Sequence, residues 1–101
     1  MHDIEFEWDE AKNRINQRKH GISFEVAREV FRDPLRVSLV DRIVSGEERW
    51  QTFGMVEGVL LLLVAHTTWD DLDMDTPVEV VRIISARKVT PMERKIYEEG
   101  R

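Results

Sequence analysis

The sequence has 101 residues, of which 42% are hydrophobic and 35% are charged, and it contains no cysteine. This length and composition fit one globular domain over residues 1–101 and exclude a disordered chain or a two-domain enzyme. The lack of cysteine excludes disulfides, thiolate metal sites and thiol nucleophiles, and the net charge of −5 argues, taken alone, against a nucleic-acid-binding protein.

The first segments predict one strand and one helix. Ile4–Trp8 alternates apolar and acidic residues, which is typical of a half-buried strand with its acidic side toward water. Asp9 is a suitable N-cap for a helix that ends at about His20. We expect Ala11 and Ile15 to form the inward side of this helix.

A second helix is predicted soon after the first. Ser23 is its N-cap, the helix reaches about Arg32, and Asp33-Pro34 ends it. Its apolar residues follow the three-to-four spacing of a buried helix face.

The middle of the chain predicts four strands. Their ranges are Val37–Val44, Arg49–Met55, Val59–Thr68 and Val78–Arg87. We expect a polar turn at Ser45–Glu48, a hairpin break at Glu57-Gly58 and an acidic connection at Trp69–Pro77. The last strand is rich in β-branched residues on both faces, which favours a place inside the sheet.

The final helix has the clearest start signal. Thr90, Pro91 and Glu93 form a capping box with proline at the first helical position, and the helix continues to about Glu99. The predicted order is therefore β-α-α-β-β-β-β-α. This order favours an α+β fold with a mainly antiparallel sheet packed against helices on one side.

Arginine and lysine residues near the C-terminus are candidates for binding an anion. Arg82 interrupts an apolar strand, so its guanidinium requires either an internal carboxylate or an external phosphate. Arg87 and Lys88 precede the last helix, whose first turn attracts anions, although a solvated charge pair is an equally good explanation. Glu93 and Tyr97 share one face of that helix.

Several of these residues also have a simpler interpretation. Glu93 is explained by the capping box, and Tyr97 by packing on the sheet. Lys19 and His20 complement the dipole of the first helix, although a histidine can also serve as an acid or a base.

Metal and cofactor sites find little support in the sequence. His2, His20 and His66 have no paired spacing, and we expect His66 to be a hydrogen-bonded core histidine. The aspartates between 70 and 75 lack the glycine and the final glutamate of an EF-hand loop, so a solvated loop is favoured. No phosphate-binding or dinucleotide-binding glycine motif occurs, and we expect neither a metal nor a cofactor.

Five stretches together resemble one protein family. They are Phe6–Lys12, Arg18–Phe24, Asp33-Pro34, Gly46–Trp50, and Val81–Lys88 continued by Glu93-Arg94 and Tyr97-Glu98. In this order they resemble the BrnT family of type II toxins, within the wider RelE/ParE-like group.

This resemblance implies a RelE-like fold and a metal-independent endoribonuclease that cleaves RNA and arrests bacterial growth. It also implies a cognate BrnA-like antitoxin, a complex of two toxins with two antitoxins, and contact with DNA only through the antitoxin. We expect such a protein to be cytoplasmic, without membrane association.

The resemblance also suggests roles for individual residues. The catalytic candidates are Arg82, Arg87, Glu93 and Tyr97, and the RNA-binding candidates are Lys19, Lys88 and Arg94. In this hypothesis the two arginines hold the scissile phosphate, and Glu93 or Tyr97 handles a proton. Two alternatives remain open on the same scaffold, namely a non-catalytic partner-binding module and a ParE-like topoisomerase inhibitor.

Overall fold

A computed structural model describes residues 3–73 and 75–100 and confirms the predicted order of elements. The helices are α1 (Glu10–His20), α2 (Phe24–Ala27), the 3-10 helix η1 (Arg28–Arg32) and α3 (Pro91–Glu98), and the strands are β1 (Ile4–Glu7), β2 (Val37–Val44), β3 (Glu47–Val56), β4 (Leu60–Asp71) and β5 (Val78–Lys88). The predicted second helix is thus two short pieces, α2 and η1. Both predicted N-caps, Asp9 and Ser23, accept backbone hydrogen bonds.

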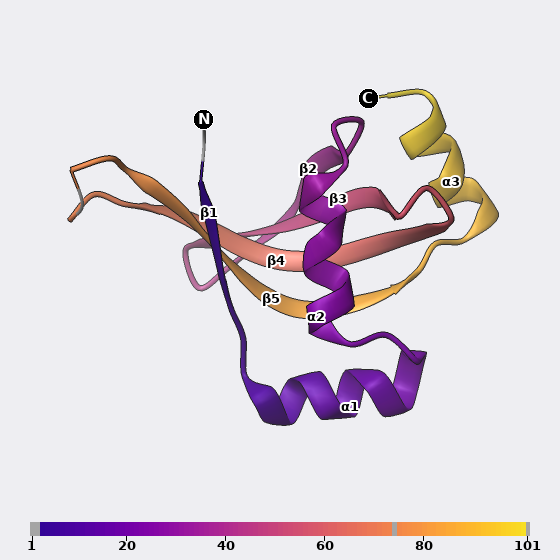
Figure 1. The fold of residues 1–101 in the computed structure, drawn as a ribbon, viewed down its shortest axis with the longest axis horizontal. Helices are drawn as coiled ribbons and strands as arrows, with labels where there is room; N and C mark the ends of the chain where they lie inside the picture. The colour runs from indigo at the N-terminus through magenta and orange to yellow at the C-terminus, as the bar shows by residue number, and fades with distance from the viewer. Residues whose placement is uncertain (1–2, 74, 101) are drawn as a thin grey trace.

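The five strands form one sheet in the order β1-β5-β4-β3-β2. β1 is parallel to β5, and the other neighbours are antiparallel. β5 therefore lies inside the sheet, as predicted. The β4–β5 hairpin extends beyond the body of the domain (Figure 1).

Two predicted connections are shorter than expected. The expected acidic connection Trp69–Pro77 is partly strand, because β4 continues through Asp71, which pairs with Val78. The expected turn Ser45–Glu48 is also shortened, since β3 already begins at Glu47. Long antiparallel pairing explains both differences, because each added pair satisfies backbone groups that a loop would leave to water.

The first face of the sheet, which carries Leu62 and Val64, is covered by α2 and η1 (Figure 1). Phe24, Val30 and other helix residues pack there against the strands in the main core. The approach is close at Gly54, where an added Cβ would lie 2.6 Å from Cγ1 of Val30. Glycine at this position therefore allows η1 to reach β3.

α1 packs differently from the prediction. Ala11 and Ile15 are exposed rather than inward, Ile15 to 53%, and the buried residues of this helix are Asn13 and Asn16. The Asn16 side chain donates to the carbonyl oxygen of Ala86 and accepts from its amide nitrogen, at 2.8 and 3.2 Å. β1 is short and pairs with β5 only as far as Arg82, so the edge of β5 at Ala86 is left for α1 to cover. The inner side of α1 is polar because it bonds to the backbone of this edge.

α3 packs on the opposite, second face of the sheet. Val37, Phe53 and Leu63 form a small cluster there, against which Ile96 and Tyr97 pack. The expectation that all helices lie on one side is therefore wrong. The alternation of side chains along β4 produces the two cores, because Leu62 and Leu63 point to opposite faces.

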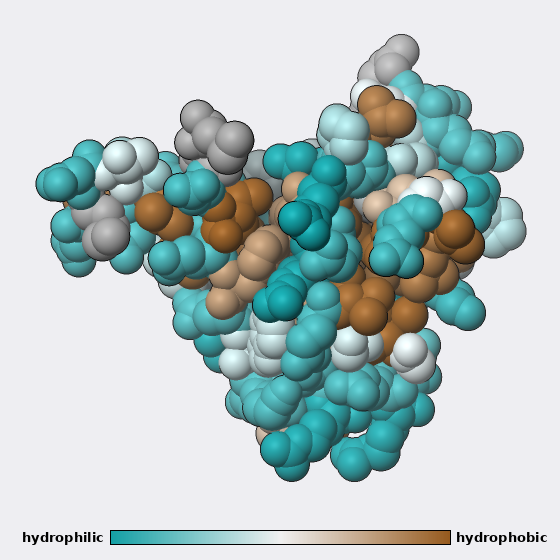
Figure 2. Space-filling model, in the orientation of Figure 1, coloured by the Kyte–Doolittle hydropathy of each residue, from teal (hydrophilic) through white to brown (hydrophobic). Residues whose placement is uncertain are grey.

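The surface is mostly hydrophilic over α1, while hydrophobic residues emerge on both sides of α2 (Figure 2). In the described part of the chain, no helix has the length and apolarity that a membrane span requires.

Candidate functional site

Arg82 and Arg87 both project from the second face of the sheet. Their neighbours Val81 and Ala86 are buried in the main core of the first face, so the arginines point the other way. α3 covers the end of this face that holds Arg87. Away from α3, the face carries Thr67 and Arg82 together with apolar residues such as Leu39 and Trp69.

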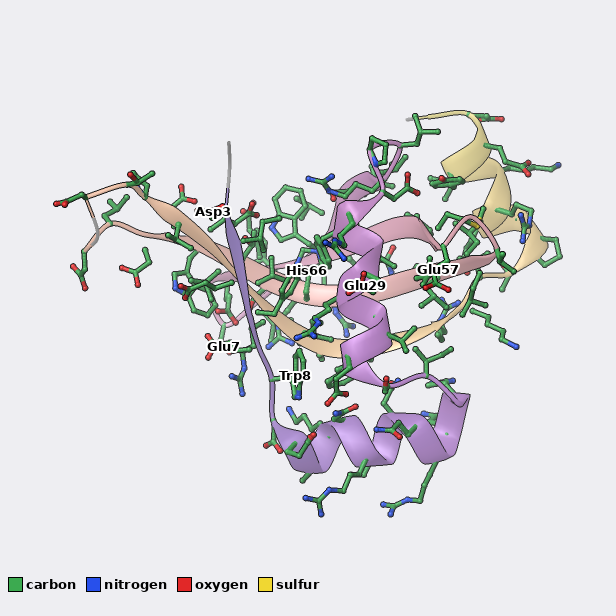
Figure 3. The ribbon with its side chains drawn as sticks, viewed as in Figure 1. Asp3, Glu7, Trp8, Glu29, Glu57 and His66 are labelled. Carbon is green, nitrogen blue, oxygen red and sulfur yellow. The ribbon has the colours of Figure 1, made fainter. Side chains whose placement is uncertain are left out.

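The two arginines do not share one partner. Arg82 is opposite Thr67 and Arg87 is opposite Leu63 on β4, and four strand positions correspond to about 13 Å. Arg82 lies 3.5 Å from a carboxylate oxygen of Glu7, at the α1 end of β1 (Figure 3), and both side chains are 44% exposed. The internal carboxylate expected for Arg82 is thus Glu7, although this pair is not buried.

Arg87 forms a tight ion pair with Glu93 at the start of α3. Its Nη1 and Nη2 atoms donate to the two carboxylate oxygens, both at 2.8 Å. These bonds, together with the amide of Thr90, outweigh burial and lower the pKa of Glu93 to about 2. The hydrogen bond to Glu93 also raises the pKa of Arg87. The predicted capping box is confirmed, so Glu93 holds both the helix start and the arginine.

Tyr97 connects α3 to the segment that follows η1. Its hydroxyl donates to Oδ2 of Asp33 at 2.6 Å, and this bond to the carboxylate raises the pKa of Tyr97 to about 12. Burial acts to raise the pKa of Asp33, but hydrogen bonds from Tyr97 and from the amides of Met55 and Leu35 outweigh it and lower that pKa. The phenol is therefore held protonated.

The three RNA-binding candidates lie in different places. Lys19 lines a hollow of about 180 Å³ with Ser85 of β5, next to the strand segment between Arg82 and Arg87. Lys88 pairs with Leu62 and lies on the first face. Arg94 lies on α3, 4.0 Å from Glu98. Of the three, only Lys19 lies beside the strand segment that joins the two arginines.

Sequence reasoning missed Arg49 as a residue of this face. The His66 ring contacts Phe31 of the main core, so His66 and its partner Trp50 lie on the first face. Arg49 precedes Trp50 and therefore lies on the second face. The period of two along β3, which places Arg49 and Phe53 on one side, is the signal that could have found it.

His66 is a core histidine, as predicted. Its Nε2 atom lies 2.6 Å from the Thr52 hydroxyl, which lies 2.7 Å from the hydroxyl of Ser38. Its Nδ1 atom donates to the carbonyl oxygen of Thr67. Burial lowers its pKa to about 4, against weaker opposing effects of Thr67 and Glu79, so the ring is neutral at pH 7 (Figure 3).

No group of three histidine, aspartate or glutamate side chains within residues 3–73 and 75–100 is arranged to hold a metal ion. This includes the aspartates of the β4–β5 hairpin that the structure describes. His2 lies outside the described residues.

The structure is thus a small α+β domain with Arg82 and Arg87 on one sheet face, and guanidinium groups are suited to binding carboxylates and phosphates. The family described as "Ribonuclease toxin, BrnT, of type II toxin-antitoxin system" matches residues 8–93. The chain belongs to this family. It is a ribonuclease toxin of a type II toxin–antitoxin system, and its partner is an antitoxin.

Among the similar solved structures is the ribonuclease toxin BrnT of Brucella abortus. The two chains are 21% identical, the match covers 89% of this chain and 99% of the other, and the TM-score is 0.54. This likeness confirms the expected α+β fold, which is shared with that BrnT structure. A search of curated proteins gives no significant match.

Proposed function

We propose that this toxin cleaves RNA without a metal ion, by attack of a 2′-hydroxyl on the adjacent phosphate at the α3 end of the second face. The observation that carries this proposal is the Arg87–Glu93 pair, which brings a phosphate-binding group and a carboxylate together at 2.8 Å, with Tyr97 one turn further along α3. Cleavage by this route requires a base, an acid and a cation that neutralises the phosphoryl oxygens.

Arg87 and Glu93 supply the cation and the base. The scissile phosphate competes with Glu93 for the guanidinium, because arginine binds both anions in the same forked geometry. When Arg87 turns to the phosphate, the main cause of the low pKa of Glu93 is removed and its pKa rises toward the ordinary value. Glu93 then accepts the proton of the 2′-hydroxyl as the 2′-oxygen bonds to phosphorus.

Tyr97 supplies the acid. The bond from phosphorus to the 5′-oxygen breaks, and the leaving oxygen takes the phenolic proton. Asp33 orients the hydroxyl at 2.6 Å until the more basic alkoxide forms. The products are a 2′,3′-cyclic phosphate and a 5′-hydroxyl.

Arg82 and Lys19 bind RNA away from the reaction. The separation of about 13 Å along the strand favours binding of Arg82 to a different phosphate from Arg87, rather than to the same one. Lys19 lies beside the strand between them. Lys88 and Arg94 add positive charge outside this path.

The test uses the toxin freed of antitoxin, with RNA in the presence of EDTA. We expect cleavage with 2′,3′-cyclic phosphate ends, and loss of about a hundredfold or more in rate for Arg87→Ala and Glu93→Gln. Full cleavage by either variant, or linear 3′-phosphate as the first product, would exclude this mechanism.

Two controls separate chemistry from folding. Thr90→Ala weakens the same cap but leaves the Arg87–Glu93 pair, so it should lower the thermal midpoint and retain cleavage. Arg32→Ala removes a highly exposed arginine of η1, which packs on the first face, and should change neither property.

We further propose a BrnA-like antitoxin, a complex of two toxins with two antitoxins, contact with DNA only through the antitoxin, and action in the cytoplasm. The acidic β4–β5 hairpin supports a basic antitoxin segment as its partner, since Trp69 and Leu72 are exposed there beside Asp70 and Asp71. Co-expression with the neighbouring gene and measurement of the mass of the complex test this; a mass other than that of the 2:2 complex would refute the stoichiometry.

A further inference from the structure

A row of residues crosses the second face of the sheet, away from α3. Arg42 on β2 is paired with Arg49 on β3, and Thr67 on β4 is paired with Arg82 on β5. Arg49 precedes Trp50, Thr67 follows His66, and Trp50 pairs with His66, so continuing this antiparallel register by one position sets Arg49 opposite Thr67 and joins the two pairs. We call Arg42, Arg49, Thr67 and Arg82 the arginine row.

Two buried donor atoms in this row lack a hydrogen-bond partner among the described residues. Nε of Arg49 and Oγ1 of Thr67 make no hydrogen bond with any of the described residues, and Thr67 is only 2% exposed. A buried polar group without a partner costs about 1–3 kcal/mol, so such groups in a native protein require an explanation. One external acceptor that reached both atoms would satisfy them.

The arginines of the row are held only by weak ion pairs. Nε of Arg49 lies 3.8 Å from Glu47, and Nη1 of Arg82 lies 3.5 Å from Glu7, and these side chains are partly or largely exposed. Exposed pairs of this kind contribute little to stability. A stronger anion can therefore replace the carboxylates without a large loss of folding free energy.

The row also places like charges next to each other. Arg42 and Arg49 are direct cross-strand partners, an arrangement that destabilises a sheet unless an anion lies between them. The backbones of Arg49 and Arg82 flank that of Thr67 at about 4.8 Å on either side, so the two guanidinium groups can meet above the threonine.

We propose that the arginine row binds a backbone phosphodiester of the RNA, with Arg49 and Thr67 as binding residues alongside Arg82. The phosphate accepts from Nε of Arg49 and from the Thr67 hydroxyl, and the guanidinium groups turn from Glu47 and Glu7 toward it. This inference rests on the proposed function, and it identifies a second phosphate contact, distant from the scissile bond at Arg87.

The first experiment observes Arg49 directly. We expect the Nε–H signal of Arg49 in ¹H–¹⁵N spectra of the toxin to shift on titration with a short 2′-O-methyl RNA, which cannot be cleaved by 2′-attack. Inorganic phosphate should shift the same signal at higher concentration. A signal that neither probe moves, while the RNA binds, would overturn the proposal.

The second experiment uses variants with opposite effects on binding and stability. Thr67→Val keeps the shape but removes an unsatisfied hydroxyl, so the thermal midpoint should stay or rise while affinity for the 2′-O-methyl RNA falls about tenfold. Arg49→Lys keeps the charge but removes Nε–H and should weaken binding similarly, whereas Arg32→Lys should not. A purely structural role of Thr67 predicts unchanged affinity.

The outcomes also separate this inference from the proposed function. If Arg87→Ala abolishes cleavage while the Arg49 and Thr67 variants bind and cleave RNA normally, only the arginine row is refuted. If the wild-type toxin leaves RNA intact but the 2′-O-methyl RNA still moves the Arg49 signal, the row is supported and the proposed chemistry is refuted.

Discussion

Acidification should destabilise this domain through His66 before it affects any carboxylate pair. The ring is 3% exposed, its Nδ1 donates to a backbone carbonyl, and its Nε2 accepts from the Thr52 hydroxyl. A proton on Nε2 would break this last bond and place a charge in the core. Burial accordingly lowers the pKa of His66 from 6.5 to about 4 in the folded state.

The unfolded chain therefore binds more protons than the folded protein between pH 6.5 and 4. Because the folded pKa is the lower one, His66 costs no stability well above pH 6.5, and stability is lost as the pH falls through this window. At pH 5 the difference is about 0.9 proton, which gives a slope of about 1.2 kcal/mol per pH unit. Between pH 6.5 and 4.5 the loss is about 2 kcal/mol.

Urea unfolding at several pH values measures this loss. The carboxylates with lowered pKa values, Glu93, Asp33 and Glu25, contribute stability above their unfolded values near 4, so their contribution is lost mainly below this window. His66→Gln is the control, since this variant has no imidazole at position 66 to titrate in either the folded or the unfolded state. The slope of its free energy of unfolding against pH should be smaller by about 1.2 kcal/mol per pH unit near pH 5. Equal slopes for the wild type and this variant would refute the burial argument.

Three further substitutions should reveal the packing of the other elements, each measured by urea unfolding at pH 7. Gly54→Ala places a Cβ 2.6 Å from Val30 and should cost about 1–3 kcal/mol; a neutral result would mean that η1 moves freely. Asn16→Ala leaves the covered edge of β5 unbonded and should cost about 3 kcal/mol, and a loss below about 0.5 kcal/mol would show that water replaces the amide. Tyr97→Phe removes the hydrogen bond to Asp33 and should cost about 1–2 kcal/mol at pH 7, with a smaller loss at pH 3; a pH-independent loss would assign the effect to packing.

Signals confined to a few neighbouring residues were predicted well from the sequence. The capping box of α3 and the caps Asp9 and Ser23 depend on side chains that bond to amides within the same turn. The alternation of Ile4–Trp8 likewise reports one strand with a buried side, where Phe6 and Trp8 pack against aromatic rings of the helices.

Features that depend on distant partners were not predicted. The inner side of α1 consists of Asn13 and Asn16, because it covers a strand edge whose backbone requires hydrogen bonds, and no apolar period marks such a face. The place of α3 on the second face depends on the pairing of Phe53 with Leu63, which exists only once the sheet is formed. Ion pairs such as Arg82–Glu7 are set by the parallel register of β1 with β5.

The net charge of −5 is a poor guide to anion binding, because the positions of charged residues on the sheet, and not their sum, determine the local potential. Strand alternation, together with the register shift between Ile83 and Ser85 of β5, places Arg82 and Arg87 on the same face as Arg49. Asp70 and Glu79 pair with each other on the β4–β5 hairpin that extends from the domain. Each of these arginines lies close to a carboxylate, at 3.8 Å from Glu47, 3.5 Å from Glu7 and 2.8 Å from Glu93, so a phosphate on the second face must displace these partners before it interacts mainly with the arginines. An acidic protein can therefore gather arginines on one sheet face, as the proposed RNA binding requires, and acids on a hairpin, as the proposed contact with a basic antitoxin segment requires.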